Sequence, residues 1–351
     1  MSFLILAALA AQPAELKVFS DWIVGCDNGK ACHATSLDGN SYDSTDKFGN
    51  VENVTYGDGD VAVSIERAAG GRGPIGVDIF MVSELKGSTR PDPASITIDG
   101  KPAPFPFTMR DGKMIFANGA DRAVVTALME GSSLELFDKG GMPAGSASLM
   151  GLTAALRYMD EQQGRLGTVT AFVEKGTKPE GAVPRPPALP IVKEPIGSSK
   201  PERILSAVPA QKERQFYPCR TPEPFMQKKE IEYYRLDTAL TLALLPAFCG
   251  TGAYNASVKA ILIDERGKIL PAKFEFPVDA EAPDLLINSW WDRKNRTLSS
   301  YQKARGLGDC GERQTYAWDG KQFRLIEAKA MSECRGSLDY ITTWRAIRAA
   351  R

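Results

Sequence analysis

The sequence predicts a mainly β protein with a few helices (α+β), built from two antiparallel β-rich domains joined by a proline-rich linker. Three observations support this prediction: apolar residues that alternate with polar ones, six cysteines behind an apolar N-terminal segment, and a cluster of prolines near the middle. The 351 residues carry no net charge, and 43% are hydrophobic and 25% charged, as in ordinary globular chains. These values exclude a disordered chain, a polytopic membrane protein and a basic protein that coats nucleic acid.

The N-terminal segment from Phe3 to Ala11 is apolar but too short to span a bilayer, which takes about 20 residues. It fits the hydrophobic region of a secretory signal, and Ala8 and Ala10 form a small-x-small cleavage pattern, although no Lys or Arg precedes it. We therefore expect residues 1–14 to be a signal peptide. The mature chain would have no membrane span and would be periplasmic or secreted by a bacterium. A buried first strand or short helix is the alternative.

The six cysteines predict three disulfides, because an even number of cysteines in an exported chain usually pairs. An Asn-Gly turn signal between Cys26 and Cys32 predicts a hairpin that brings these two sulfur atoms together. The remaining four cysteines lie beyond the linker, where we expect Cys219 to pair with Cys249 and Cys310 with Cys334. With no Cys-x-x-Cys motif and one histidine, we expect no metal site and no cofactor.

The expected linker covers residues 178–203 and separates a domain at 15–177 from one at 204–351. Its seven prolines, at positions 179, 184, 186, 187, 190, 195 and 201, exclude a helix or a central strand and favour an extended spacer. A proline-rich loop packed on one domain is the alternative. The charge changes sign across it, from −8 over residues 1–174 to +5 over residues 202–351. The basic half either attracts the acidic half weakly or faces an anionic partner.

Period-two alternation and turn signals place the strands of the first half at 22–24, 34–37, 61–65, 77–81, 107–109, 114–116 and 169–173. A short helix is expected at 122–130. A second helix is expected after Ser148 as its N-cap, with Leu149, Leu152, Leu156 and Met159 on its apolar face and Gly164 at its end. Arg157, Asp160 and Glu161 are expected on its solvent-facing side.

The second half is expected to form an antiparallel meander of about six strands, with a β-sandwich as the architecture. The expected strands are 240–244, ended by Pro246, and 258–263, 269–276, 285–291, 297–302, 316–318 and 323–325. Asp319-Gly320 between the last two is a hairpin signal.

The sequence contains little that indicates catalysis. His33 lies on the expected hairpin, where a structural role is favoured over a catalytic one, and no phosphate-binding glycine loop follows a strand. The segment 57–60 resembles part of a calcium loop but is better explained as a polar turn. Paired carboxylates remain a route to hydrolysis, and Asp292, Asp309 and Glu312 are the candidates because they lie near aromatic residues.

Two clusters could bind a ligand or form an interface. Trp290 and Trp291 lie beside a turn, and because neighbouring strand residues face opposite sides, one of them is expected to be core. Arg305 and Asp309 lie in a glycine-rich loop that a cysteine anchors, which is typical of a ligand-binding loop but equally of a tight turn.

Several motifs resemble an exported bacterial family, that of domain of unknown function 1176. They are 21–28, 245–255, 305–311, Trp318-Asp319-Gly320 with Phe323, and Cys334-Arg335-Gly336. The resemblance implies a periplasmic protein of Gram-negative bacteria and brings no established activity. The first half is also similar to the invasion associated locus B proteins, through Trp22-x-x-x-Cys26 and the segment 148–156.

Taken together, the sequence predicts an exported, non-catalytic binding or interaction protein of the cell envelope. Its expected partner is an envelope protein or an anionic polymer, and not nucleic acid. The first alternative is a carboxylate-dependent hydrolase acting on an envelope polymer, which requires two acids about 5–10 Å apart in a cleft. The second is a structural envelope protein, which would have no cleft and no exposed aromatic patch.

Overall fold

The computed structural model describes residues 13–37, 61–81, 93–110, 113–117, 119–198, 200–203, 231–247, 254–276, 278, 281 and 283–350. Almost all of the predicted signal peptide lies outside these residues, as do the segment 57–60 and the predicted pair of Cys219 with Cys249.

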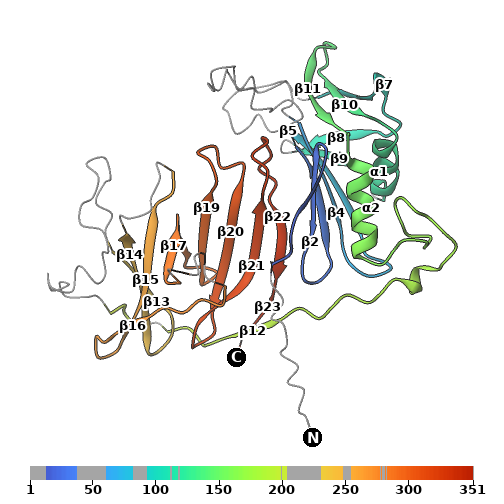
Figure 1. Ribbon diagram of the computed structural model, residues 1–351. Coiled ribbons are helices and arrows are strands. Elements are labelled where there is room, and N and C mark those ends of the chain that lie inside the picture. Colours follow the sequence, from blue (N-terminus) through green and yellow to red (C-terminus); the bar gives the residue numbers. More distant parts are fainter. Residues whose placement is uncertain are drawn as a thin grey trace, which may run out of the picture. The chain divides into compact units, whose positions relative to one another are not determined.

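The predicted fold class is confirmed, because antiparallel strands dominate the described residues and two α-helices interrupt them (Figure 1). The described residues divide into two units, one formed mainly by residues up to 188 and the other mainly by residues from 189 onward. The exact domain boundaries and the sandwich architecture stay predictions.

The strands of the first unit are β1 (Lys17–Phe19), β2 (Trp22–Cys26), β3 (Cys32–Ser36), β4 (Val61–Arg67), β5 (Ile75–Met81), β6 (Ser95–Ile98), β7 (Lys101–Pro102), β8 (Phe107–Arg110), β9 (Lys113–Phe116), β10 (Ser133–Phe137) and β11 (Pro143–Ser148). They form a seven-stranded sheet in the order β1-β2-β3-β4-β5-β9-β8 and a four-stranded sheet in the order β11-β10-β6-β7. The strands β6, β7, β10 and β11 were not predicted.

Two helices, α1 (Asp121–Met129) and α2 (Leu152–Gln162), bury their apolar faces in a core that both sheets share. The predicted apolar face of α2 is confirmed at Leu152, Leu156 and Met159. The prediction of Ser148 as the N-cap was wrong. The N-cap of α2 is Gly151, whose φ of +99° lies in the left-handed region that glycine adopts readily. The Ser148 hydroxyl instead donates to the Asp21 carboxylate at 2.6 Å.

The prediction of a solvent-facing Asp160 was also wrong. Asp160 follows Leu156 by four residues, which places it on the buried face of the helix, and it is fully buried. Its Oδ2 accepts the backbone N–H groups of Phe172 and Val173 at 2.6 and 3.0 Å. Because this carboxylate uses the donors that a sheet ladder would need, the expected strand at 169–173 does not form, and the segment runs in turns.

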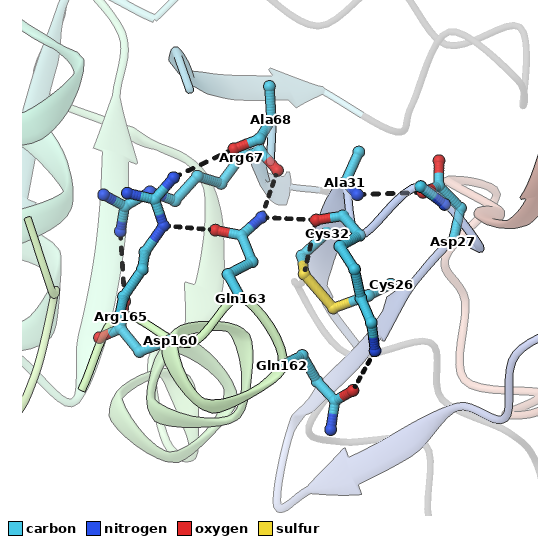
Figure 2. The surroundings of a disulfide bond; sticks show 12 residues. Cys26, Asp27, Ala31, Cys32, Arg67, Ala68, Asp160, Gln162, Gln163 and Arg165 are labelled. Atoms are coloured by element: carbon cyan, nitrogen blue, oxygen red, sulfur yellow. Dashed lines mark hydrogen bonds and ion pairs between the residues drawn. A yellow bond between two sulfur atoms is a disulfide. The ribbon is translucent and has the colours of Figure 1, made fainter. Parts of the chain in front are cut away.

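The predicted hairpin of the first two long strands pairs Cys26 with Cys32, and the disulfide joins them. The end of α2 holds the turn of this hairpin, as Figure 2 shows. The Gln163 amide donates to the carbonyl oxygens of Lys30 and Arg67, at 2.8 and 3.0 Å, and the Lys30 ammonium donates to Gln162 at 3.1 Å. The disulfide is therefore one of several ties between this turn and the helix.

The remaining strands are β12 (Ile191–Glu194), β13 (Glu232–Arg235), β14 (Leu240–Ala247), β15 (Ser257–Asp264), β16 (Ile269–Pro271), β17 (Leu285–Ile287), β18 (Trp290–Asp292), β19 (Thr297–Lys303), β20 (Gly311–Trp318), β21 (Phe323–Met331), β22 (Ile341–Arg345) and β23 (Ile347–Ala350). They belong to the second unit, except that residues Ile341–Trp344 of β22 belong to the first. One sheet has the order β13-β14-β15-β16, with β17 also on β15, and another has the order β18-β19-β20-β21-β22 (Figure 1). The expected single meander is therefore two sheets, although the predicted hairpin that pairs Trp318 with Phe323 is confirmed.

The division into two sheets occurs inside a segment that was predicted as one strand, 285–291. Asn288 breaks it with a φ of +43°, so that β17 pairs with β15 while β18 pairs with β19. The Asn288 side chain holds this break, since its Oδ1 accepts Ala256 N–H at 2.9 Å and its Nδ2 donates to the Tyr301 carbonyl at 3.0 Å. Asparagine tolerates this backbone region better than other non-glycine residues.

Pro246 was expected to end its strand, but β14 continues through it to Ala247. The described pairing with β13 ends at Leu244, so the missing N–H of Pro246 is not needed on that side. In the proline-rich segment, β12 pairs in parallel with β23 and buries Val192. Whether this segment also acts as a spacer stays a prediction.

Candidate functional site

A row of side chains crosses one face of the sheet β18–β22. Trp290 pairs with Ser299, Ser299 with Thr315, and Thr315 with Glu327. Directly paired residues of antiparallel strands point to the same face, and the hydroxyls of Ser299 and Thr315 lie 3.3 Å apart. We call the face that these four side chains share the polar face.

A pocket of about 470 Å³ adjoins this row, because Thr315 and Glu327 are among its lining residues. Its volume falls within the range of small-molecule sites. The polar residues that line it are Asn295, Thr297, Thr315, Glu327, Arg345 and Arg348. The pocket therefore offers hydroxyls, an amide, a carboxylate and guanidinium groups, the set that a polyhydroxylated ligand uses.

One arginine of the pocket is held in place. The Arg348 guanidinium donates to both carboxylate oxygens of Glu194, at 2.5 and 2.9 Å, and to the Asn295 carbonyl at 2.5 Å. The hydrogen bond that Arg348 donates to Glu194 raises the pKa of Arg348. This clamp fixes the pocket wall through the parallel pair β12–β23, on which both residues lie.

The two adjacent tryptophans have different environments. Trp291 is half-buried and stacks on Tyr234 with ring centroids 5.7 Å apart, whereas the side chain of Trp290 is 48% exposed. Arg293 covers the same Tyr234 ring at 4.8 Å. Trp291 is thus part of the packing, and Trp290 is an exposed indole at the end of the row that reaches the pocket.

Arg305 and Asp309 bind each other. The Arg305 guanidinium donates to both Asp309 oxygens, at 2.8 and 2.5 Å, and Gly336 N–H donates to Asp309 at 2.8 Å. Burial raises the pKa of Asp309, but Arg305 and Gly336 outweigh it, and the pKa lies below its ordinary value. Together with the disulfide from Cys310 to Cys334, these bonds hold the glycine-rich loop in shape. A ligand role for Arg305 and Asp309 stays a prediction.

The three carboxylates proposed for hydrolysis are not among the residues that line the pocket. The Asp292 carboxylate accepts a hydrogen bond from the Asn295 backbone N–H at 2.9 Å in a turn. Hydrogen bonds from Asn295 lower the pKa of Asp292. Asp309 is buried in its ion pair, and Glu312 alternates with Arg313, so it points away from the polar face. Among the described residues that line the pocket, Glu327 is the only carboxylate.

The first unit has its own cluster of charged side chains, which is closed. Arg165 is fully buried, and it donates to Gln163 and to the Ala68 carbonyl (Figure 2). It also donates to Thr170 and to the Gly70 carbonyl, so that all three nitrogens are used. Arg67 donates to Asp160 at 3.2 Å, and burial, followed by the charge of Arg165, lowers the pKa of Arg67 to about 9. These arginines satisfy carbonyl groups of the fold and expose no surface to a ligand.

His33 is buried on β3 and lies 2.8 Å from the Ser64 hydroxyl. Within the described ranges, no group of three or more His, Cys, Asp or Glu side chains could hold a metal ion. No helix of the described part of the chain is long and apolar enough to cross a membrane.

The sequence reasoning found Trp290 but missed the pocket. The strands β19 and β20 are polar at most positions, including Ser300, Gln302, Glu312 and Gln314, so no period-two alternation marks one of their faces. Thr297 and Ser299 are also buried, although polar residues of that kind usually lie at the surface. The residues from Arg345 onward, which complete the pocket, carry no such alternation either.

A family model described as "Protein of unknown function (DUF1176)" matches residues 16–348. The uncharacterized protein YpfG of Escherichia coli (strain K12) is 28% identical in an alignment 365 positions long, which covers 92% of this chain and 90% of that protein. The crystal structure of invasion associated protein B from Bartonella henselae is similar with a TM-score of 0.28 and 18% identity, over 43% of this chain and 99% of that chain. A TM-score this low does not establish a shared fold.

Proposed function

We propose, from the premise that the chain belongs to the DUF1176 family of proteins of unknown function, that it is an exported, non-catalytic binding protein of the bacterial cell envelope. Two observed disulfides support export, because disulfides persist in oxidising compartments such as the periplasm. The family match agrees with the motifs that predicted it and leaves the ligand open.

The single observation that carries the proposal is the polar pocket with an exposed indole at the other end of its row. Trp290 and Thr315 lie two strands apart in the same row, which is roughly 10 Å at the spacing of neighbouring strands. An exposed aromatic ring provides a flat apolar surface, and the pocket provides hydrogen-bonding groups. This combination supports binding of a saccharide, such as part of an envelope polymer.

The experiment is a pull-down of saccharide from envelope extract with the immobilised mature protein, analysed by sugar composition after acid hydrolysis. We expect the wild type to retain saccharide and Trp290→Ala to retain at least about 10-fold less, since aromatic hot spots contribute about 2 kcal/mol or more. The matched control is Met142→Ala, which removes another exposed apolar side chain, 65% exposed, from the first unit. Retention of no saccharide by the wild type, or equal retention by the Trp290 variant, would contradict the proposal.

No observation favours the two alternatives. A hydrolase needs a second acid beside Glu327, and the described pocket lining contains none. A purely structural protein would lack both a pocket and an exposed tryptophan next to it, whereas the second unit has both.

A further inference from the structure

The polar face contains a second feature, an arginine set into a corner of two tyrosines. The Arg313 guanidinium carbon lies 4.3 Å from the Tyr301 ring centroid and 4.4 Å from that of Tyr340. The two rings meet at 82°, with their centroids 5.9 Å apart. The hydroxyls of Tyr301 and Tyr340 both donate hydrogen bonds to the Gly308 carbonyl, at 2.6 and 3.0 Å.

This aromatic corner, Tyr301 and Tyr340, is rigid for two reasons. Tyr301 lies on β19 within the sheet, and the Gly308 carbonyl that holds both hydroxyls belongs to the loop anchored by the Cys310 disulfide. The corner therefore fixes the plane of the Arg313 guanidinium before any ligand arrives. A side chain that is already ordered loses less entropy when it binds.

The guanidinium of Arg313 keeps its two outer nitrogens available. Its Nε is buried with no hydrogen-bond partner, and no ion pair or hydrogen bond reaches its outer nitrogens from the residues that the structure describes. Arginine presents two parallel N–H groups that match the two oxygens of a carboxylate or phosphate. Contacts with tyrosine faces favour the cation but satisfy none of these donors.

The surrounding charges are net positive and favour an anion. Lys329 pairs with Arg313 across the strands, and Lys303 lies 5.6 Å from the Tyr301 ring. Glu327 lies 3.8 Å from the Lys329 ammonium and offsets part of this positive charge. The ladder of β19, β20 and β21 already uses the backbone N–H groups here, so a dianionic phosphate lacks the backbone donors that usually bind it.

We infer that Arg313, held in the aromatic corner, binds the carboxylate of an acidic saccharide whose sugar rings extend along the polar face toward the pocket. Arg313 and Thr315 are two residues apart on β20 and share this face, which separates them by roughly 7 Å. A short acidic oligosaccharide could therefore contact Arg313, the pocket and Trp290 together. The inference rests on the proposed function and names its ligand class.

The test is isothermal titration of the full mature chain with oligogalacturonate and with the methyl ester of the same oligomer, which removes the charge and keeps the sugar. We expect the wild type to bind the acid roughly 10- to 100-fold more tightly than the ester, the range for hydrogen bonds to charged groups. Arg313→Gln should abolish this preference, and Arg313→Lys should restore only part of it. The matched control is Lys321→Gln, which removes one positive charge from a turn of the same unit.

Equal binding of acid and ester by the wild type would overturn the carboxylate inference while leaving saccharide binding in place. Retention of the preference by Arg313→Gln would overturn it as well. If neither oligomer binds while Trp290 still controls saccharide retention from envelope extract, the ligand class is wrong and the proposed function stands. Thermal unfolding of each variant, which should match the wild type within about 3 °C, excludes loss of folding as the cause.

Discussion

Arg165 of the first unit and Arg313 of the second unit are used in opposite ways. In the first unit, all three nitrogens of Arg165 donate hydrogen bonds, and the side chain is fully buried. In the second unit, Arg313 is half-buried against two tyrosine rings, and its Nε has no partner. An arginine whose donors are all used by carbonyl and side-chain oxygens holds the fold together. One whose plane is fixed while its outer nitrogens stay available is suited to a ligand.

The largest expected effect tests the structural half of this comparison. Arg165→Met should destabilise the first unit by about 3–5 kcal/mol, because it removes the buried, charged donor of the Ala68 carbonyl, the Gly70 carbonyl and the Gln163 side chain. Urea unfolding measures it. The control is Arg157→Met on the exposed side of α2, where a surface ion pair with Glu174 contributes about 1 kcal/mol or less. Equal losses from both variants would contradict the comparison.

The two disulfides offer the next effect. Cys310 and Cys334 close a loop with a sequence separation of 24, and Cys26 and Cys32 close one with a separation of 6. Restriction of the unfolded chain predicts a loss of about 3–4 kcal/mol for the double alanine variant of the long loop and about 2 kcal/mol for the short one. Calorimetric unfolding of both double variants checks the order. A larger loss at Cys26 and Cys32 would show that their hairpin, and not loop length, dominates.

The loop beside the aromatic corner gives a pH-dependent effect. Asp309→Asn should cost about 1–3 kcal/mol at pH 7, since the Asp309 carboxylate accepts hydrogen bonds from Arg305 and Gly336. Because the folded-state pKa of Asp309 lies below its ordinary value, this contribution is fully present above the unfolded pKa of about 3.9 and is lost as pH falls through the folded pKa. The gap between wild type and variant should therefore be equal at pH 7 and pH 5 and narrow toward pH 2. A constant gap down to pH 2 would contradict this account.

The smallest expected effect concerns stability at Arg313 itself. Arg313→Gln should change the free energy of unfolding by about 1 kcal/mol or less, because it removes contacts with two rings but also a buried N–H that has no partner. Urea unfolding beside Arg165→Met provides the direct contrast. A loss as large as that of Arg165→Met would make Arg313 a structural arginine like those of the first unit.

Local patterns predicted much of this fold, and they failed where one side chain decides the outcome. Period-two alternation found the strands that contain Val63 and Ile79, and the Asp319-Gly320 turn signal found the hairpin closed by Trp318 and Phe323. The strand predicted at 169–173 was wrong because of Asp160. Its buried carboxylate accepts backbone N–H groups of this segment, which a strand would donate to a neighbouring strand.

The site was harder to predict, because it too depends on contacts of single side chains. Trp290 and Trp291 were recognised as a pair with one exposed member, which follows from strand geometry. Nothing in the sequence places Tyr340 beside Tyr301, since 38 intervening residues separate them and the contact depends on how the loop at Gly308 folds. Arg313 and Arg165 look alike in the sequence, and only their surroundings distinguish them.

The most direct test of the central claim is hydrogen exchange of the mature protein with and without saturating oligogalacturonate. We predict slower exchange in peptides covering β18, β19 and β20 and the segment from Tyr340 to Arg348, with the helices of the first unit unchanged. Protection confined to the first unit, or no protection under conditions where titration shows binding, would contradict the account.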